Sequence, residues 1–467
     1  MTTTVRNTDF VGPGIGFAFT ANFDAFWLTQ GSILASTATF GIVGNFQGLV
    51  ALIDGNLLGT GGISFFGQGN SVTVGINGSI AATSPSVTRI AVALNGMDSS
   101  LINHGAITSQ NLGVASSGQC LIENTGTIDG RVGGVFMNLS DVLINSGTIS
   151  AGLSGVGEVT SFYFHGVQVS GGDARIVNLG TITAVDPQGA GVNLASGLPN
   201  TQADGARIEN YGTISSARFW GIDAIFMQSG TAITVINHGL ISGSGGGLRG
   251  GGSVDTVRNT GTIQGSVLLQ TGDDIYDGRG GQVIGQIFGE DGFDALTGGD
   301  QDDGMFGGTG NDFLIGKAGD DELFGEDDND IIRGGLGDDL IVGGDGDDTM
   351  SGGAGDDEIV LGGVGTDVLS GNAGLDKFIF GFASQLGNGS NRDIITDFAL
   401  GDLVDLRGLA PSLIFIGSGA FSGVAGQLRY VAGTGILSFD LDGDKIIDHQ
   451  LQFANNAALI AASFILV

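Results

Sequence analysis

The residues of this sequence with the most evident chemistry are aspartates that recur every nine positions between residues 289 and 379. Most copies read G-G-x-G-x-D-x-U-x, where U is a large apolar residue, and residues 307–315 form a complete copy. The sixth position is Asp294, Asp303, Asp312, Asp321, Asp330, Asp339, Asp348, Asp357, Asp367 and Asp376. Acidic side chains repeated at glycine-rich turns favour a series of cation sites over a single catalytic centre.

The glycines and the aspartate of each turn are spaced suitably for binding calcium. Glycines permit a tight turn that points carbonyl oxygens at one spot, and the aspartate adds a carboxylate. Calcium takes roughly six to eight oxygen ligands, about twice what one turn supplies. Two nonapeptides make one coil, so alternate turns share an edge and the U side chain points inward. The best pairs are Asp339 with Asp357 and Asp348 with Asp367, although the extra residue Leu361 precedes the last of these.

Some copies depart from the pattern. Gln301 and Asp328 replace the glycine at position four, which places the sites of copies 298–306 and 325–333 in doubt. The second glycine is replaced by Glu290, Lys317, Glu326 and Asn372. We expect about five to seven calcium ions to be bound. The position-five aspartates Asp338, Asp347 and Asp356 are expected to face solvent rather than a metal ion.

A second acidic pattern surrounds Gly443 and contains Asp440, Asp442, Asp444 and Asp448. Alternate aspartates around a glycine are typical of a calcium loop. An EF-hand would need a glutamate at its twelfth position, where this chain has a leucine. We therefore keep two interpretations, a further calcium site and a polar turn between strands.

The nonapeptides resemble the hemolysin-type calcium-binding repeats of RTX proteins of the type I secretion class. Residues 393–398 and 401–406 resemble the segment that closes the repeats in serralysin-type proteins. The resemblance implies a parallel β-roll with calcium between stacked turns. It also implies an uncleaved C-terminal signal for an ABC-type exporter and a secreted, extracellular or cell-surface location. The first residues lack the pattern of a cleavable signal peptide, and residues 461–467 are apolar, which agrees with that route.

A longer repeat, with the core N-x-G-x-I, occupies residues 71–270. Its asparagines are Asn103, Asn124, Asn145, Asn178, Asn210, Asn237 and Asn259, spaced 21, 21, 33, 32, 27 and 22 residues apart. A unit of 21 or 22 residues predicts one coil of a parallel β-helix, with insertions in some coils. The asparagines are expected to form a structural ladder. The pattern is similar to the β-helix repeats of surface and autotransporter proteins.

The sequence thus predicts an all-β protein in four parts. Residues 1–70 are an N-terminal cap, 71–270 a right-handed parallel β-helix and 271–380 the calcium-binding β-roll that continues it. Residues 381–467 form a C-terminal β cap with the secretion signal. The aromatic residues Phe17, Phe19, Phe23, Phe26 and Trp27 fit an apolar cap, with a binding face as the alternative.

Charge and cysteine content limit the partners and the covalent cross-links that the protein can have. The net charge is -33, and residues 271–376, with 27 acids and 3 bases, carry -24 of it. Such a segment repels itself and excludes a nucleic-acid partner, whereas divalent cations suit it. The single cysteine, Cys120, cannot form an intrachain disulfide. No apolar stretch is long enough to predict a transmembrane helix.

The sequence gives only weak indications of an enzyme active site. Tyr163, His165, Asp186, Arg218 and Asp223 could converge on the β-helix, but no recognised motif joins them. Metalloprotease and serine-nucleophile motifs are absent from the sequence. We therefore predict a secreted calcium-binding β-solenoid with a surface, matrix or adhesive role that binds polysaccharide or a cell surface. An extracellular polysaccharide lyase, hydrolase or epimerase on the β-helix is the alternative, and a surface-lattice protein is a third hypothesis.

Overall fold

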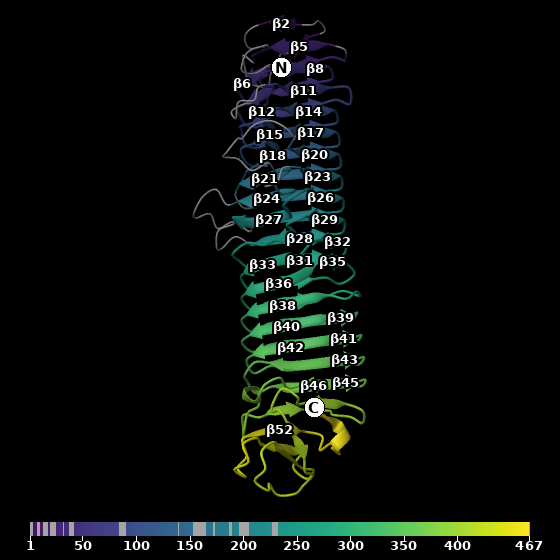
Figure 1. Ribbon diagram of the computed structural model, residues 1–467. Helices are drawn as coiled ribbons and strands as arrows, with labels where there is room; N and C mark the ends of the chain where they lie inside the picture. The colour runs from purple at the N-terminus through teal and green to yellow at the C-terminus, as the bar shows by residue number, and fades with distance from the viewer. Residues whose placement is uncertain are drawn as a thin grey trace. The chain divides into compact units, whose positions relative to one another are not determined.

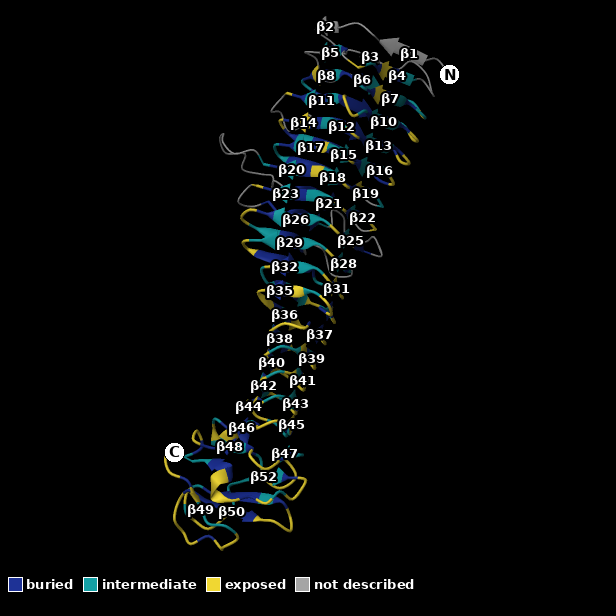
Figure 2. Cartoon of the chain, turned by 90° about the vertical axis from the view of Figure 1, so that its right-hand side faces the viewer, coloured by how far each residue is buried: buried dark blue, intermediate teal, exposed yellow. Residues whose placement is uncertain are grey.

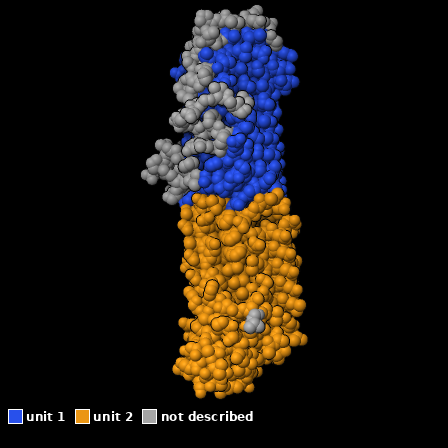
Figure 3. Space-filling view, in the orientation of Figure 1, with its two compact units in different colours: residues 1–267 blue, residues 268–467 orange. Residues whose placement is uncertain are grey.

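The structure, a computed structural model, forms two compact units, residues 1–267 and 268–467 (Figure 3). It describes residues 3–6, 10–12, 17–18, 25–30, 32–36, 42–83, 90–138, 140–152, 165–170, 173–185, 189–195, 205–226 and 232–466. Within these ranges all regular structure is β strand, apart from the 3-10 turns η1 (Ala383–Gln385) and η2 (Ala461–Ser463). The predicted all-β fold is confirmed.

In the first unit, successive strands visit three parallel sheets in turn, as Figure 1 shows for the stacked strands β11 to β29. The first sheet contains β1 (Thr3–Arg6), β4 (Ala25–Leu28), β7 (Val50–Ile53), β10 (Ser71–Val74), β13 (Ser100–Asn103), β16 (Leu121–Asn124), β19 (Val142–Asn145), β22 (Arg175–Asn178), β25 (Ala206–Asn210), β28 (Ile233–Asn237) and β31 (Thr256–Asn259).

The second sheet contains β2 (Phe10–Gly12), β5 (Ile33–Ser36), β8 (Asn56–Gly59), β11 (Ser79–Ala82), β14 (Ala106–Ser109), β17 (Thr127–Gly130), β20 (Thr148–Ala151), β23 (Thr181–Ala184), β26 (Thr213–Ser216), β29 (Leu240–Gly243) and β32 (Thr262–Gln264). The third sheet contains β3 (Phe17–Ala18), β6 (Ile42–Gly44), β9 (Ile63–Phe65), β12 (Ile90–Leu94), β15 (Leu112–Ser116), β18 (Gly133–Met137), β21 (Val167–Ser170), β24 (Val192–Ala195), β27 (Trp220–Phe226) and β30 (Gly246–Arg249).

The N-x-G-x-I motif explains this stacking. Its isoleucine, which lies in the second sheet, is fully buried in every coil from Ile107 to Ile263. Its asparagine ends the first-sheet strands from β13 to β31 and is also buried. The Asn145 amide donates to Asn178 Oδ1 at 2.8 Å, and Asn178 donates to Asn210 Oδ1 at the same distance. Each coil therefore satisfies buried polar groups of its neighbour, and the ladder is structural.

The stacked coils include residues upstream of residue 71. Strands β4 to β9, within residues 25–65, pair in parallel with the coils that follow. Of the aromatic cluster in the predicted cap, Phe26 is buried in this stack and Trp27 is 44% exposed. The side chains of the other three members of that cluster lie outside the described residues.

The second unit begins as a two-sheet roll. Roll sheet one contains β34 (Ile275–Asp277), β37 (Ala295–Thr297), β39 (Phe313–Ala318), β41 (Ile331–Leu336), β43 (Thr349–Ala354), β45 (Val368–Ala373), β47 (Asp393–Ile395) and β52 (His449–Phe453). Roll sheet two contains β36 (Gln286–Asp291), β38 (Gly304–Thr309), β40 (Glu322–Asp327), β42 (Leu340–Asp345), β44 (Glu358–Gly362), β46 (Lys377–Ile379), β48 (Leu403–Asp405) and β53 (Phe464–Ile465). The remaining strands are β33 (Val267–Thr271), β35 (Gln282–Ile284), β49 (Ile414–Phe415), β50 (Gln427–Val431) and β51 (Ile436–Asp440).

The roll follows the nonapeptide period. Each strand pairs with the strand two copies later, so two nonapeptides make one coil. The position-eight side chains form the core, and all are at most 1% exposed from Leu296 to Phe378. Buried and more exposed residues alternate along the roll strands, and Figure 2 colours the chain by burial. The inserted residue Leu361 is also fully buried and leaves the pairing of β42 with β44 in register.

Removing one rung of the asparagine ladder should weaken the first unit. Asn178→Ala removes one acceptor of the Asn145 amide, which keeps the Gly147 and Thr181 carbonyls, and removes the donor to the buried side-chain oxygen of Asn210. We expect the free energy of unfolding to fall by about 1–3 kcal/mol, measured by urea denaturation followed by circular dichroism. Ser146→Ala, at an exposed position in the stacked turn one coil earlier, is the control and should change stability by less than about 0.5 kcal/mol. Equal effects of the two substitutions would contradict the ladder's role.

Candidate metal centre

The repeat aspartates form two ladders, one along each edge of the roll. In every ladder step, Oδ1 of an aspartate accepts a hydrogen bond from the backbone N–H of the aspartate one coil earlier. The N···O distances are 2.7–3.2 Å. Both pairs singled out from the sequence occur: Asp339 N–H donates to Asp357, and Asp348 N–H donates to Asp367.

The second carboxylate oxygen of the ladder aspartates, Oδ2, takes no part in the ladder hydrogen bonds. Oδ2 is buried and has no hydrogen-bond partner among the described residues in Asp294, Asp312, Asp321, Asp330, Asp339, Asp348, Asp357, Asp367, Asp376 and Asp393. In all of these aspartates except Asp367 and Asp393, Oδ2 lies over the position-one glycine of its own turn. A Cβ on Gly334 would come within 2.0 Å of Asp339 Oδ2 and 2.7 Å of the Gly352 carbonyl oxygen. The glycine therefore makes room for a cradle of carboxylate and carbonyl oxygens.

This cradle fits a calcium ion. A buried charged oxygen without a partner is costly, and a hard cation that prefers oxygen ligands removes that cost. Burial is the main cause of a raised pKa throughout the ladders, and neighbouring aspartates add to it. The pKa reaches about 6 in Asp294, about 7 in Asp348 and about 8 in Asp330.

Two buried aspartates of the first unit show the contrast. Asp141 accepts from the backbone of Cys120 and Asn138 and from the Ser116 hydroxyl. Asp255 accepts from two backbone N–H groups, one on each oxygen. Both oxygens of these carboxylates have chain donors. The unsatisfied Oδ2 is thus a property of the roll turns, and burial alone does not produce it.

The two copies that lack the position-four glycine differ in their backbone conformation at that position. Asp328 adopts φ +78°, so the fifth copy keeps the left-handed turn that glycine usually provides, and Asp330 stays in the ladder. Gln301 in the second copy does not have a positive φ. There Asp303 Oδ2 accepts from the Gly299 N–H of its own loop. The aspartate of the second copy therefore presents no free oxygen of this kind.

Position-five side chains have a separate role. Asp338, Asp347 and Asp356 are exposed, as expected. Asp338 Oδ1 accepts from the backbone N–H of Asp356 in the next coil, and Asp347 accepts from that of Thr366. These outer rows tie neighbouring coils together without facing the cradles.

The ladders extend beyond the repeats identified from the sequence. Asp274 N–H donates to Asp294, Asp367 N–H donates to Asp393, and Asp376 N–H donates to Asp402. Sequence reasoning missed these three positions as site residues. Asp274 stands twenty residues before Asp294, whereas Asp393 and Asp402 stand 26 residues after their partners. The short apolar strand that begins at or directly after each of these aspartates, and not the nine-residue spacing, is the sequence signal that could have identified them.

The C-terminal acidic loop brings three of its four candidate residues together. Oxygen atoms of Asp440, Asp442 and Asp444 lie within 4.8 Å of one another, with Asp440 buried and the other two exposed. Backbone N–H groups of the loop donate to each of them. Asp448 is turned elsewhere and accepts from the Leu441 N–H. Metal binding at this loop stays a prediction.

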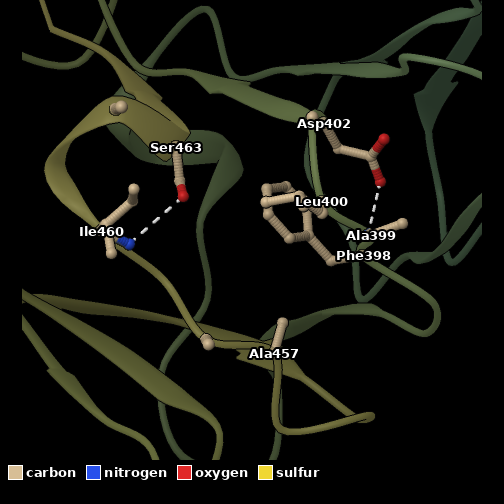
Figure 4. A pocket seen from close by; sticks show the side chains of 10 residues that line it. Phe398, Ala399, Leu400, Asp402, Ala457, Ile460 and Ser463 are labelled. Carbon is tan, nitrogen blue, oxygen red and sulfur yellow. Dashed lines mark hydrogen bonds between the residues drawn. The ribbon is translucent and has the colours of Figure 1, made fainter.

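Figure 4 shows a mostly apolar hollow of about 370 Å³ in the C-terminal cap, lined by residues 398–402 and by others between 457 and 463. Asp402 is in its wall, but its carboxylate turns to the Ala399 N–H. The hollow therefore offers no cation ligand of the ladder kind.

The candidate catalytic residues of the first unit converge only in part. Tyr163 and Asp186 lie outside the described residues, and Arg218 is exposed. His165 and Asp223 are both buried. Burial lowers the pKa of His165 to about 4, against the opposing effect of the Asp223 charge. Both Asp223 oxygens accept from the Arg249 guanidinium at 2.9 Å.

The fold and these cradles define a parallel β-solenoid whose second unit holds stacked, partnerless carboxylates. A family model, the RTX calcium-binding nonapeptide repeat, matches four copies, at residues 285–314, 306–341, 333–363 and 357–382. None of the curated proteins compared with the chain matches it. Residues 285–382 of this β-solenoid therefore carry RTX calcium-binding nonapeptide repeats. Among the described residues, no helix is long and apolar enough to cross a membrane.

The roll should respond to pH in opposite directions with and without calcium. A carboxyl whose pKa is higher when folded stabilises the fold below its unfolded value, near 4, and loses that effect as pH rises through about 6 to 8. Without calcium, lowering the pH from about 8 to 5.5 should therefore increase β structure. With calcium the ionised form is bound, so the same change should weaken the fold. Circular dichroism at both conditions checks this, and parallel pH curves would contradict it.

Adjacent aspartates should differ in calcium binding. Asp339→Asn keeps the ladder acceptor but removes the charge of a buried Oδ2, so calcium stoichiometry should fall by about one to two ions. Asp338→Asn changes an exposed position-five side chain and should leave stoichiometry unchanged. Equilibrium dialysis measures both. A loss that is equal in the two variants would show that the buried oxygens are not the ligands.

Proposed function

We propose that calcium binding folds the roll after export, and that the protein then acts as an extracellular surface, matrix or adhesive component. The observation that carries the proposal is the row of buried Oδ2 atoms without partners. A segment with 27 acids and 3 bases repels itself, and its buried carboxylates oppose compaction unless a cation is bound. Metal binding and folding are then a single process.

The difference in calcium concentration between the cytosol and the exterior would determine where the roll folds. Extracellular modules bind calcium with dissociation constants of roughly 10⁻⁴–10⁻³ M, far above the concentration in a cytosol. The roll would stay open inside the cell and close outside it. The C-terminal residues 381–467 would carry the signal for an ABC-type exporter, as the resemblance to type I-secreted proteins implies.

A surface role is favoured over catalysis by the polar groups of the β-helix. The buried asparagines bond to one another, and Asp223 is engaged by Arg249. A polysaccharide-active enzyme is the second candidate, because Asp223 pairs with Arg249 on the third sheet and its charge acts on the buried His165. Incubation with acidic polysaccharides, followed by assays for unsaturated ends and reducing sugars, separates the two.

The calcium step is tested on the full chain. Titration of calcium into the metal-free protein should raise the β signal in circular dichroism and slow proteolysis of residues 268–467. Magnesium at the same concentration is the control, because it demands a stricter geometry. An unchanged spectrum at about 10 mM calcium would overturn the proposal.

The export step is tested in bacteria that carry a type I exporter. The intact chain should reach the medium, and a chain lacking residues 381–467 should be retained. Asp338→Asn serves as the matched secreted control. Export of the truncated chain at the level of the intact chain would exclude a signal in that segment.

A further inference from the structure

The third sheet of the first unit has the longest connections. Fifteen residues separate the end of β20 at Ala151 from the start of β21 at Val167, and ten separate β24 from β25. Only two residues separate β14 from β15. Long connections commonly carry function on a regular scaffold. This directs attention to the outer face of β21, β24, β27 and β30.

A polar row crosses that face in register. Gln168 pairs with Asn193, Asn193 with Asp223, and Asp223 with Arg249. Their strand neighbours, such as Ile222, form the core, so the row points away from the core, with Asn193 and Asp223 themselves buried. The outward residues of the second sheet are mostly short threonine and serine side chains. The row is therefore a local feature of the third sheet.

The guanidinium of Arg249 is held in place. Its Nε and Nη2 donate to the two oxygens of Asp223 at 2.9 Å. Asp223 is fully buried, while the Arg249 side chain is 17% exposed. A bidentate pair fixes the plane of the guanidinium, and the Nη1 group lies outside the pair.

Two aromatic rings complete the arrangement. The Arg249 guanidinium carbon lies 5.2 Å from the centre of the Trp220 ring and 5.5 Å from that of Phe219. Trp220 packs on Gly246, where a Cβ would come within 2.1 Å of a ring carbon. Both rings are partly exposed, and the neighbouring Arg218 is exposed. A glycine is thus needed for the position of the tryptophan.

We propose that Trp220, Phe219, Arg218 and Arg249 bind an acidic polysaccharide of the uronate type. The Nη1 donors of Arg249 and the charge of Arg218 would receive a uronate carboxylate. The exposed parts of the two rings would contact the apolar C–H groups of the pyranose. Arginine and tryptophan held rigidly in advance lose little entropy on binding. This inference rests on the proposed surface role and names its partner.

The test uses the full chain with calcium and short oligogalacturonates that do not gel. Isothermal titration should show binding that weakens with salt, and none to neutral dextran oligosaccharides. The double variant D223N/R249M removes the pair without leaving a buried charge, and it should weaken binding at least about tenfold. Trp220→Ala and Gly246→Ala should also weaken it. Arg175→Met, which removes an exposed arginine bonded to Glu209 on the first sheet, should bind as the wild type does.

The possible results of this experiment separate support for the polysaccharide site from its refutation. Absence of binding to the wild type, or equal binding to dextran, would overturn the inference. So would unchanged affinity in both D223N/R249M and Trp220→Ala, or an equal loss in Arg175→Met. Calcium-induced folding is read separately by circular dichroism. A protein that folds with calcium but ignores oligogalacturonate therefore refutes this site and leaves the calcium mechanism standing.

Discussion

A carboxylate oxygen buried without a partner is the constraint on which the roll depends. In most repeat turns, Oδ1 of the aspartate accepts from the coil before it and Oδ2 lies over a glycine without a donor. Protonation removes the cost of burying the unpaired charged oxygen in acid, and a bound calcium ion would remove that cost at neutral pH. Asp141 and Asp255 show how the same side chain is accommodated when chain donors reach both oxygens. Under the proposed function, the second unit therefore depends on bound calcium in a way that the first unit does not.

The sequence was most informative where a residue is required by stacking. The position-eight core, the same-edge aspartate pairs and the asparagine ladder all follow from period and residue type, and all appear in the structure. The uneven copies were harder. Gln301 and Asp328 replace the same glycine, but only Asp328 takes the left-handed conformation. Backbone preference in one turn depends on the turns stacked against it, which a single copy does not contain.

The sequence could not locate Asp393 and Asp402, because the insertion after the repeats breaks the spacing while the strands resume their places. Nor could it join Asp223 with Arg249. These residues are 26 apart and become partners only because β27 and β30 stack in register. Contacts between coils depend on insertion lengths, so they follow from the pairing of strands and not from local pattern.

The direction of the aspartate bonds has a consequence for the ends of the roll. Every ladder aspartate offers its N–H to the coil that comes later in the chain, so no coil is complete until its successor is present. The last acceptors, Asp393 and Asp402, belong to the closing segment and not to the repeats. The array thus has a polarity, because each coil donates to a later coil and the closing segment supplies the final acceptors. Repeats could be added or lost within it, whereas the terminating segment has no substitute among them.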